Sequence, residues 1–159
     1  MAEEKERPAP IRQSVRVDCP IDEAFELFTE RMTEWWPLES HSTAGQEAEE
    51  CAFEPRVGGR VFERTQAGEE REWGRILVWE PPRRIEFTWH PGSRDEDGQT
   101  VELEFCTEAN GTRVTLTHRG WHLAGAQALA SSGQYAMPWS SILEACFAEF
   151  VAREILVYA

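Results

Sequence analysis

Apolar and polar side chains alternate along most of the chain, and this alternation predicts a sheet. In the clearest run, Val101, Leu103 and Phe105 alternate with Glu102 and Glu104. Such a period of two gives a strand one dry face and one wet face. Strands are predicted at residues 11–17, 49–55, 60–66, 71–80, 84–90, 100–108 and 112–119. An Asn-Gly turn at 110–111 predicts a tight hairpin between the last two.

Two segments instead carry a helical period. Between Pro20 and Pro37, the apolar residues Ile21, Phe25 and Phe28 recur at helical spacing, which predicts a helix pair after the first strand. From Trp139 onward, apolar residues return in steps of three and four up to Val151. A helix of about 18 residues would span roughly 27 Å, enough to cross a sheet diagonally.

The order of these elements predicts an α+β, helix-grip fold. A curved antiparallel sheet of about seven strands would wrap a long C-terminal helix. One helix does not fill a strongly curved sheet, so an apolar cavity is expected between them. Residues 11–159 are interpreted as a single domain, and residues 1–10, charged and rich in Pro, as a disordered tail.

Charge and composition exclude several classes of partner. The net charge of −13 argues against a nucleic-acid binder and against an anionic membrane surface. The sequence has no apolar run long enough for membrane insertion and no secretory h-region. The four Cys are widely spaced and interpreted as buried free thiols, which favours a cytoplasmic location. No metal site and no cofactor are predicted.

Several motifs resemble one known superfamily. They are FELFTERMTEWWPLESHS at 25–42, EPRVGGR at 54–60, WGRI at 73–76, PPRRIEFTW at 81–89 and GTRVTLTHRGW at 111–121. Over roughly residues 11–155 the chain resembles the START-like, or SRPBCC, superfamily, in the branch related to the C-terminal domain of the activator of Hsp90 ATPase. Pro138-Trp139 stands where that branch usually has Gly-Trp.

This resemblance implies the helix-grip fold and leaves the activity open. The superfamily includes lipid carriers, hormone receptors, polyketide cyclases and aromatases, oxygenase subunits and co-chaperone domains, so the fold does not dictate the function. It supplies no shared catalytic motif that maps onto this chain, and no catalytic residue is assigned.

The dry sheet face and the stripe of the last helix supply the predicted ligand-binding residues. For any one of them a plain core position is favoured over a ligand contact, because an apolar stripe is first of all a core stripe, and the set as a whole is better supported than its members. Trp35 and Trp36 are placed at the mouth, and His118 and Tyr135 are the polar contacts. The full predicted set is Trp35, Trp36, Phe87, Trp89, Leu103, Phe105, Leu116, His118, Tyr135, Trp139, Leu143, Cys146 and Phe150.

Other polar candidates carry weaker chemistry. His118 and His122 are four residues apart at a strand end, without a carboxylate at ligand spacing, so a structural histidine is favoured over zinc ligation. Glu39 and His41 form an alternative acid–base pair near the mouth, although solvated loop residues have the same pattern.

Three functions are compatible with these patterns. The first is a binding protein whose partner is a hydrophobic small-molecule ligand, aromatic or lipid-like. The second is a cyclase- or aromatase-like enzyme acting on a bound polyketide-like substrate, with His90, His118 and Tyr135 as acid–base candidates. The third is an Hsp90-associated co-chaperone-like module, for which no exposed contact patch is evident. A homodimer is left open.

Overall fold

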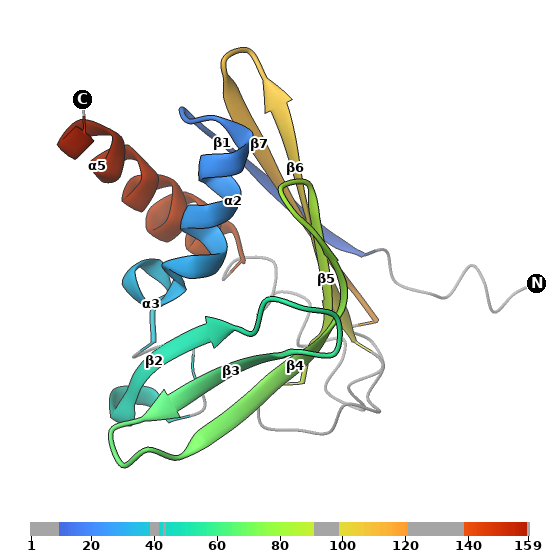
Figure 1. The fold of residues 1–159 in the computed structure, drawn as a ribbon, viewed down its shortest axis with the longest axis vertical. Helices are drawn as coiled ribbons and strands as arrows, with labels where there is room; N and C mark the ends of the chain where they lie inside the picture. The colour runs from blue at the N-terminus through green and yellow to red at the C-terminus, as the bar shows by residue number, and fades with distance from the viewer. Residues whose placement is uncertain (1–9, 39–41, 43, 91–98, 121–138, 159) are drawn as a thin grey trace, which may run out of the picture.

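An antiparallel sheet of seven strands forms the frame of the molecule (Figure 1). The computed structural model describes residues 10–38, 42, 44–90, 99–120 and 139–158. The tail predicted at 1–10 therefore lies outside the described residues except for Pro10. The strands are β1 Ile11–Val17, β2 Ala48–Phe53, β3 Arg60–Thr65, β4 Glu70–Glu80, β5 Arg84–Thr88, β6 Thr100–Glu108 and β7 Gly111–Arg119.

The strand order β1-β7-β6-β5-β4-β3-β2 makes every neighbouring pair but one consecutive in sequence. The exception is β1, which joins the far edge by pairing with β7, so that Ile11 lies opposite His118. The predicted strands and the hairpin at Asn110-Gly111 are confirmed, and so is the helix-grip fold.

The register divides the sheet into an inner and an outer face. Phe87 lies opposite Val101, and Val101 lies opposite His118, so these three side chains share the inner face. Phe25 of the first helix contacts Phe105 on that face at a ring-centroid distance of 5.1 Å. The helices therefore cover the inner face, as the alternating pattern predicted.

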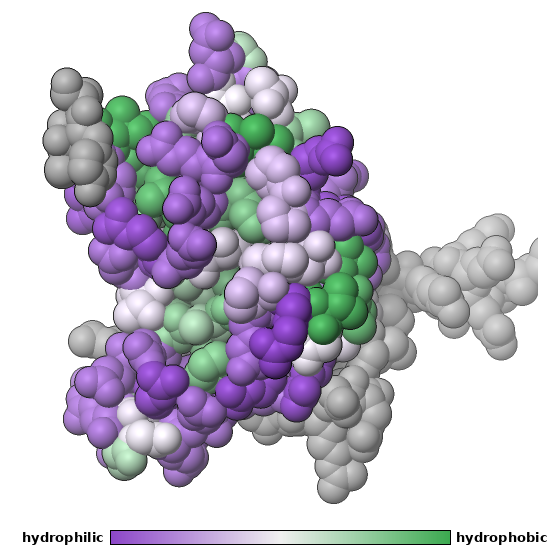
Figure 2. Space-filling view, viewed as in Figure 1, coloured by the Kyte–Doolittle hydropathy of each residue, from purple (hydrophilic) through white to green (hydrophobic). Residues whose placement is uncertain are grey.

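The outer face holds a network of ion pairs. Glu102 is only 6% exposed although it faces outward. The guanidinium groups of Arg84 and Arg119 bind its two oxygens and cover it. Cys106, opposite Arg113, is also on this face and is exposed, so the prediction of a buried thiol is wrong at that position. Figure 2, viewed from the side of α2 and β2, shows polar side chains over much of that surface, with apolar patches among them.

The strand with the least clear pattern, β4, contains a bulge. Ile76 lies opposite Phe87 and Val78 opposite Glu86, so Leu77 is an extra residue without a partner position. A bulge of this kind switches the faces of the residues that follow it. Ile76 and Trp79 consequently both belong to the inner side, which a strict alternation does not allow.

The helix pair consists of α2 Ile21–Glu30 and α3 Met32–Trp35, separated at Arg31. A short 3-10 helix, η1 Gly45–Glu47, precedes β2. The last helix begins at Trp139, passes through a π-helical stretch, η4 Ile142–Ala148, and continues as α5 Glu149–Tyr158. The wider turns of a π-helix rotate the apolar stripe, and Cys146 is only half-buried.

Aromatic rings join these elements into one core. Phe28 of α2 contacts Phe53 of β2, Phe105 of β6 and Phe147 of η4, with centroid distances of 6.2, 5.7 and 5.0 Å. A second group of rings lies at the other end of the sheet and consists of Trp36, Trp73, Trp89 and Trp139. Ring contacts thus anchor the last helix at its first residue, Trp139, and near its middle, at Phe147.

Candidate functional site

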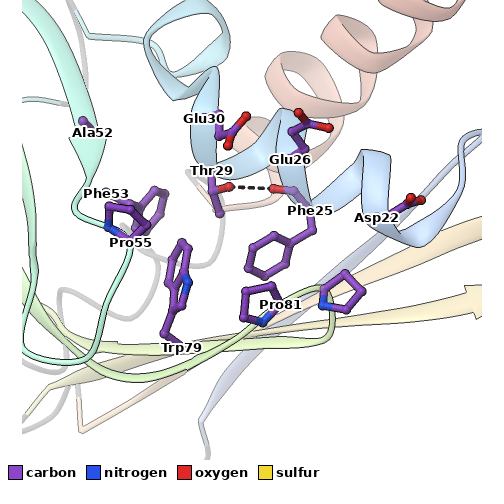
Figure 3. Close-up of a pocket in the computed structure, with 11 residues that line it drawn as sticks. Asp22, Phe25, Glu26, Thr29, Glu30, Ala52, Phe53, Pro55, Trp79 and Pro81 are labelled. Atoms are coloured by element: carbon purple, nitrogen blue, oxygen red, sulfur yellow. Dashed lines mark hydrogen bonds between the residues drawn. The ribbon is translucent and has the colours of Figure 1, made fainter.

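A pocket of about 660 Å³ opens between α2, the end of β2 and the turn that joins β4 to β5 (Figure 3). Its volume falls in the range of small-molecule sites. The lining residues are Asp22, Phe25, Glu26, Thr29, Glu30, Ala52, Phe53, Pro55, Trp79, Pro81 and Pro82.

Three rings and three prolines supply the apolar surface of this pocket. The ring of Trp79 lies 5.4 Å from that of Phe25 and 6.4 Å from that of Phe53, centroid to centroid. Figure 3 shows the three rings and Pro81 gathered around the same opening, with α2 above them. Rings at these separations pack favourably against one another, and together they form a continuous apolar wall.

The α2 side of the pocket is acidic. Asp22, Glu26 and Glu30 follow one another at intervals of four residues, which places them on one side of the helix. Loss of water contact, and then the charge of Glu26 and a hydrogen bond with it, raises the pKa of Glu30. The α2 edge of the pocket therefore concentrates negative charge.

Local sequence explains how these residues are presented. In α2 the buried residues include Phe25 and Phe28, while Glu26 and Glu30 are exposed, so the helix lays one apolar stripe on the sheet and keeps the acids at its edge. The hydroxyl group of Thr29 donates to the Phe25 carbonyl at 2.8 Å and is satisfied within the helix. The bulge at Leu77 turns Trp79 inward.

Most of the residues predicted to bind a ligand lie behind this pocket. Tyr135 lies outside the described residues, and Cys146 is half-buried. The others are buried in the core: Trp35, Trp36, Phe87, Trp89, Leu103, Phe105, Leu116, His118, Trp139, Leu143 and Phe150. No described member of the predicted set lines the pocket, yet Phe105 touches Phe25 and Phe87 touches Phe53 at 5.6 Å. Their role in ligand binding stays a prediction.

His118 is fully buried and its ring has a defined tautomer. The indole Nε1 of Trp139 donates to His118 Nδ1 at 3.1 Å, and because an indole nitrogen only donates, Nδ1 must be the acceptor. The proton therefore sits on Nε2, which lies 2.9 Å from Gln99 Oε1. Burial lowers the pKa of His118 to about 4, so the ring is neutral near pH 7.

Glu63 is a buried carboxylate that sequence reasoning missed. It is 0% exposed on β3 and accepts a hydrogen bond from Trp73 Nε1 at 2.6 Å and one from the Ala44 amide at 3.1 Å. The sequence did contain a signal for its burial. Glu63 lies between Val61 and Thr65, both buried, and alternation along a strand places all three side chains on one face.

The remaining polar candidates are placed as follows. His90 is 4% exposed, with Nε2 3.4 Å from Glu72 Oε2. Glu39, His41 and His122 lie outside the described residues. Within the part of the chain that the structure describes, no group of His, Cys, Asp and Glu side chains is arranged to hold a metal ion.

Residues 18–151 match the family described as activator of Hsp90 ATPase homolog 1-like protein. The chain belongs to this family. The resemblance noted for the motifs is thereby confirmed, including its branch. A search of curated proteins gives no match.

Solved structures similar to this member of the Hsp90-activator-like family confirm the fold. An anthrahydroquino-γ-pyrone synthase, Txn09, solved in complex with SUM, is 36% identical, with a TM-score of 0.55 over 79% of this chain and 85% of that one. CalU16 from Micromonospora echinospora is 26% identical, with a TM-score of 0.59 over 92% and 78%. The Aha1 dimer from Colwellia psychrerythraea is 15% identical, with a TM-score of 0.61 over 86% and 91%.

A helix can span a membrane only when it has sufficient length and apolar character. Among the helices that the structure describes, none has the length and apolar character needed to cross a membrane.

Proposed function

We propose that this protein binds a planar aromatic small molecule in the pocket beneath α2. The observation that carries this proposal is the set of rings Phe25, Phe53 and Trp79 around a space of about 660 Å³. The helix-grip fold of the family commonly holds hydrophobic ligands, and the pocket supplies both an apolar wall and a polar edge that can orient a guest.

The energetics favour a flat, largely apolar guest. A two-ring molecule burying on the order of 250 Å² of apolar surface gains about 6 kcal/mol at 25 cal/mol per Å². Association and ordering of side chains cost a large part of that gain. Two-ring probes are therefore expected to bind with micromolar to millimolar dissociation constants, and the natural ligand to be larger.

A larger ligand would reach the residues predicted from sequence. Two rings of the pocket wall separate it from the interior. The ring of Phe25 contacts that of Phe105, and the ring of Phe53 contacts that of Phe87. Rotation of the Phe25 ring would connect the pocket to the inner face of β6. In this proposal the predicted interior set forms the deep end of one site whose entrance is the pocket beneath α2.

Replacing Trp79 with alanine tests the proposal. The variant should bind naphthol, a neutral two-ring probe, at least about tenfold more weakly, because it loses the stacking surface. Calorimetric titration measures the dissociation constants. Trp79→Phe keeps a ring and should stay within about threefold of the unaltered protein. Val57→Ala is the control, since Val57 is 64% exposed and outside the pocket lining.

Equal binding of naphthol by the unaltered protein and by Trp79→Ala would rule out this pocket. Perturbation of backbone amide signals at Phe53 and Trp79 on titration would locate the probe, whereas changes confined to other parts of the sheet would place it elsewhere.

A second candidate function is ring closure on a bound aromatic substrate. It is favoured by the 36% identity to a protein named as an anthrahydroquino-γ-pyrone synthase. The pocket would hold the substrate folded in a reactive geometry, and the carboxyl pair at Glu26 and Glu30 would exchange a proton with it. Incubation with an anthrahydroquinone that carries an open side chain, followed by mass spectrometry, tests this. Conversion no faster than in buffer would reject it.

The other expectations remain predictions. An Hsp90-associated role, a homodimer and a cytoplasmic location have no direct support beyond the family and fold. The Aha1 dimer shares 15% identity with this chain, which carries over the fold alone.

A further inference from the structure

We propose that the pocket beneath α2 selects planar aromatic cations, that is, ring systems carrying a protonated amine, over neutral and anionic molecules of the same size. This inference rests on the proposed function and names the ligand class of the same site. Three kinds of observation support it: the charges that line the pocket, the engagement of nearby arginines, and the rings beneath the acids.

The lining charges have a single sign. Asp22, Glu26 and Glu30 belong to the pocket wall, and the described residues that line it include no Lys, Arg or His. An anionic ligand would be repelled by three carboxyl groups and would find no positive charge among the described lining residues. A protonated amine would instead find hydrogen-bond acceptors along the α2 side of the pocket. Charge complementarity of this kind separates ligands that bury equal apolar area.

The nearest arginine along α2 is held by other partners. Arg31 directly follows the helix, and its guanidinium binds Glu34 and Glu154, in each case at 2.5 Å. On the β2 side, Arg60 binds Glu54 and Glu70, both at 3.0 Å. These ion pairs keep two cations away from the rim and leave its acids available for a guest.

Arg83 lies close in sequence to the prolines of the pocket but contributes to a different depression. It lines a neighbouring hollow with Arg84, Glu104 and Cys106, on the other side of the β4–β5 turn. The two hollows therefore differ in charge: the one beneath α2 has only acids among its described ionisable lining residues, and its neighbour has acids and arginines.

Two of the acids at the rim are neighbours on the helix surface. Glu26 and Glu30 are four residues apart on α2, so they lie on one side of the helix, and both line the pocket. Figure 3 shows their side chains next to each other on α2, above the ring of Trp79. A protonated amine can donate to these carboxylates while its ring system lies against the indole of Trp79, which is also a favourable cation–π partner.

A matched probe series tests the selectivity. Naphthylmethylamine, naphthol and naphthoate share one ring system and differ in charge. We expect the amine to bind about tenfold more tightly than naphthol and naphthoate to bind most weakly. Added salt should reduce the advantage of the amine and leave naphthol nearly unchanged, because only the charged contact is screened.

The double variant Glu26→Gln/Glu30→Gln should bring the dissociation constants of the amine and naphthol to within about twofold of each other. Glu23→Gln removes a charge from the same helix at a residue outside the pocket lining, and should preserve the preference for the amine. Both substitutions keep side-chain shape and helix propensity, so the fold is expected to persist.

The outcomes separate this inference from the proposed function. If none of the three probes binds, the proposed function is wrong and the inference with it. If naphthol binds in the pocket and the amine binds no better, the aromatic site stands and the cation preference is overturned. An amine preference that survives the double variant would also overturn it, because the charge would then lie elsewhere.

Discussion

Replacing Phe147 with alanine is expected to lower the free energy of unfolding by about 3–5 kcal/mol. The ring is 0% exposed, and its centroid lies 5.0 Å from that of Phe28 and 5.1 Å from that of Trp35. It is thus the ring through which η4 touches both helices of the pair. Removal would leave a cavity that neither rigid ring can fill. Urea denaturation monitored by circular dichroism measures the change.

The size of this effect follows from the position of the ring and not from aromatic character in general. A domain of this kind has a total stability of about 5–15 kcal/mol, so the loss would be a large fraction of it. Phe147→Leu, which keeps most of the volume, should cost less than Phe147→Ala. Val57→Ala, at a residue that is 64% exposed, should change stability by less than about 0.5 kcal/mol. A loss below about 1 kcal/mol for Phe147→Ala would contradict the packing described here.

Acidification from about pH 6.5 towards pH 4 is expected to destabilise the protein through His118. Burial lowers the pKa of this ring from 6.5 to about 4 in the folded state. The folded state therefore resists a proton that the unfolded chain accepts, so stability is complete above the unfolded pKa and is lost as the pH falls through that window. The difference corresponds to roughly 3 kcal/mol at the lower end.

Ring-nitrogen chemical shifts provide the direct measurement. They should show His118 as the neutral Nε2–H tautomer well below pH 6.5, where an ordinary histidine side chain titrates. The His118→Phe variant should have a lower denaturation midpoint than the unaltered protein at neutral pH. Its midpoint should change little between pH 6.5 and pH 4, because the substituted ring binds no proton. Arg60 holds the pKa of Glu54 down at about 2, so loss of that ion pair belongs to a more acidic range. A midpoint of histidine titration near 6.5 would contradict the buried, neutral ring.

Much of the fold could be predicted because its signals are local. The alternation of β6 and β7, the Asn-Gly turn between them and the stripe from Trp139 to Val151 each lie within one element. Backbone geometry converts such periods into strands and helices without reference to the rest of the chain. The inner-face positions of Phe87, Leu103 and Leu116 follow in the same way.

The candidate site was less predictable because it depends on contacts between distant segments. Phe25, Phe53 and Trp79 belong to α2, β2 and β4, and their meeting is not encoded in the period of any one of them. Trp79 also follows the bulge at Leu77, which displaces it from the face that alternation assigns. Two further features, the burial of Glu63 and the tautomer of His118, depend on indole partners from other elements.

By itself, then, the amino-acid sequence determined the elements, their order, the helix-grip class and most of the side chains turned towards the inner face, Trp79 excepted, because backbone periodicity and turn chemistry act over a few residues. The tertiary structure alone decided where a pocket opens, which acids border it and which interior polar groups satisfy one another. Those outcomes depend on the bulge at Leu77 in β4 and on ring contacts across the sheet, and such distances arise only when all the elements pack at once.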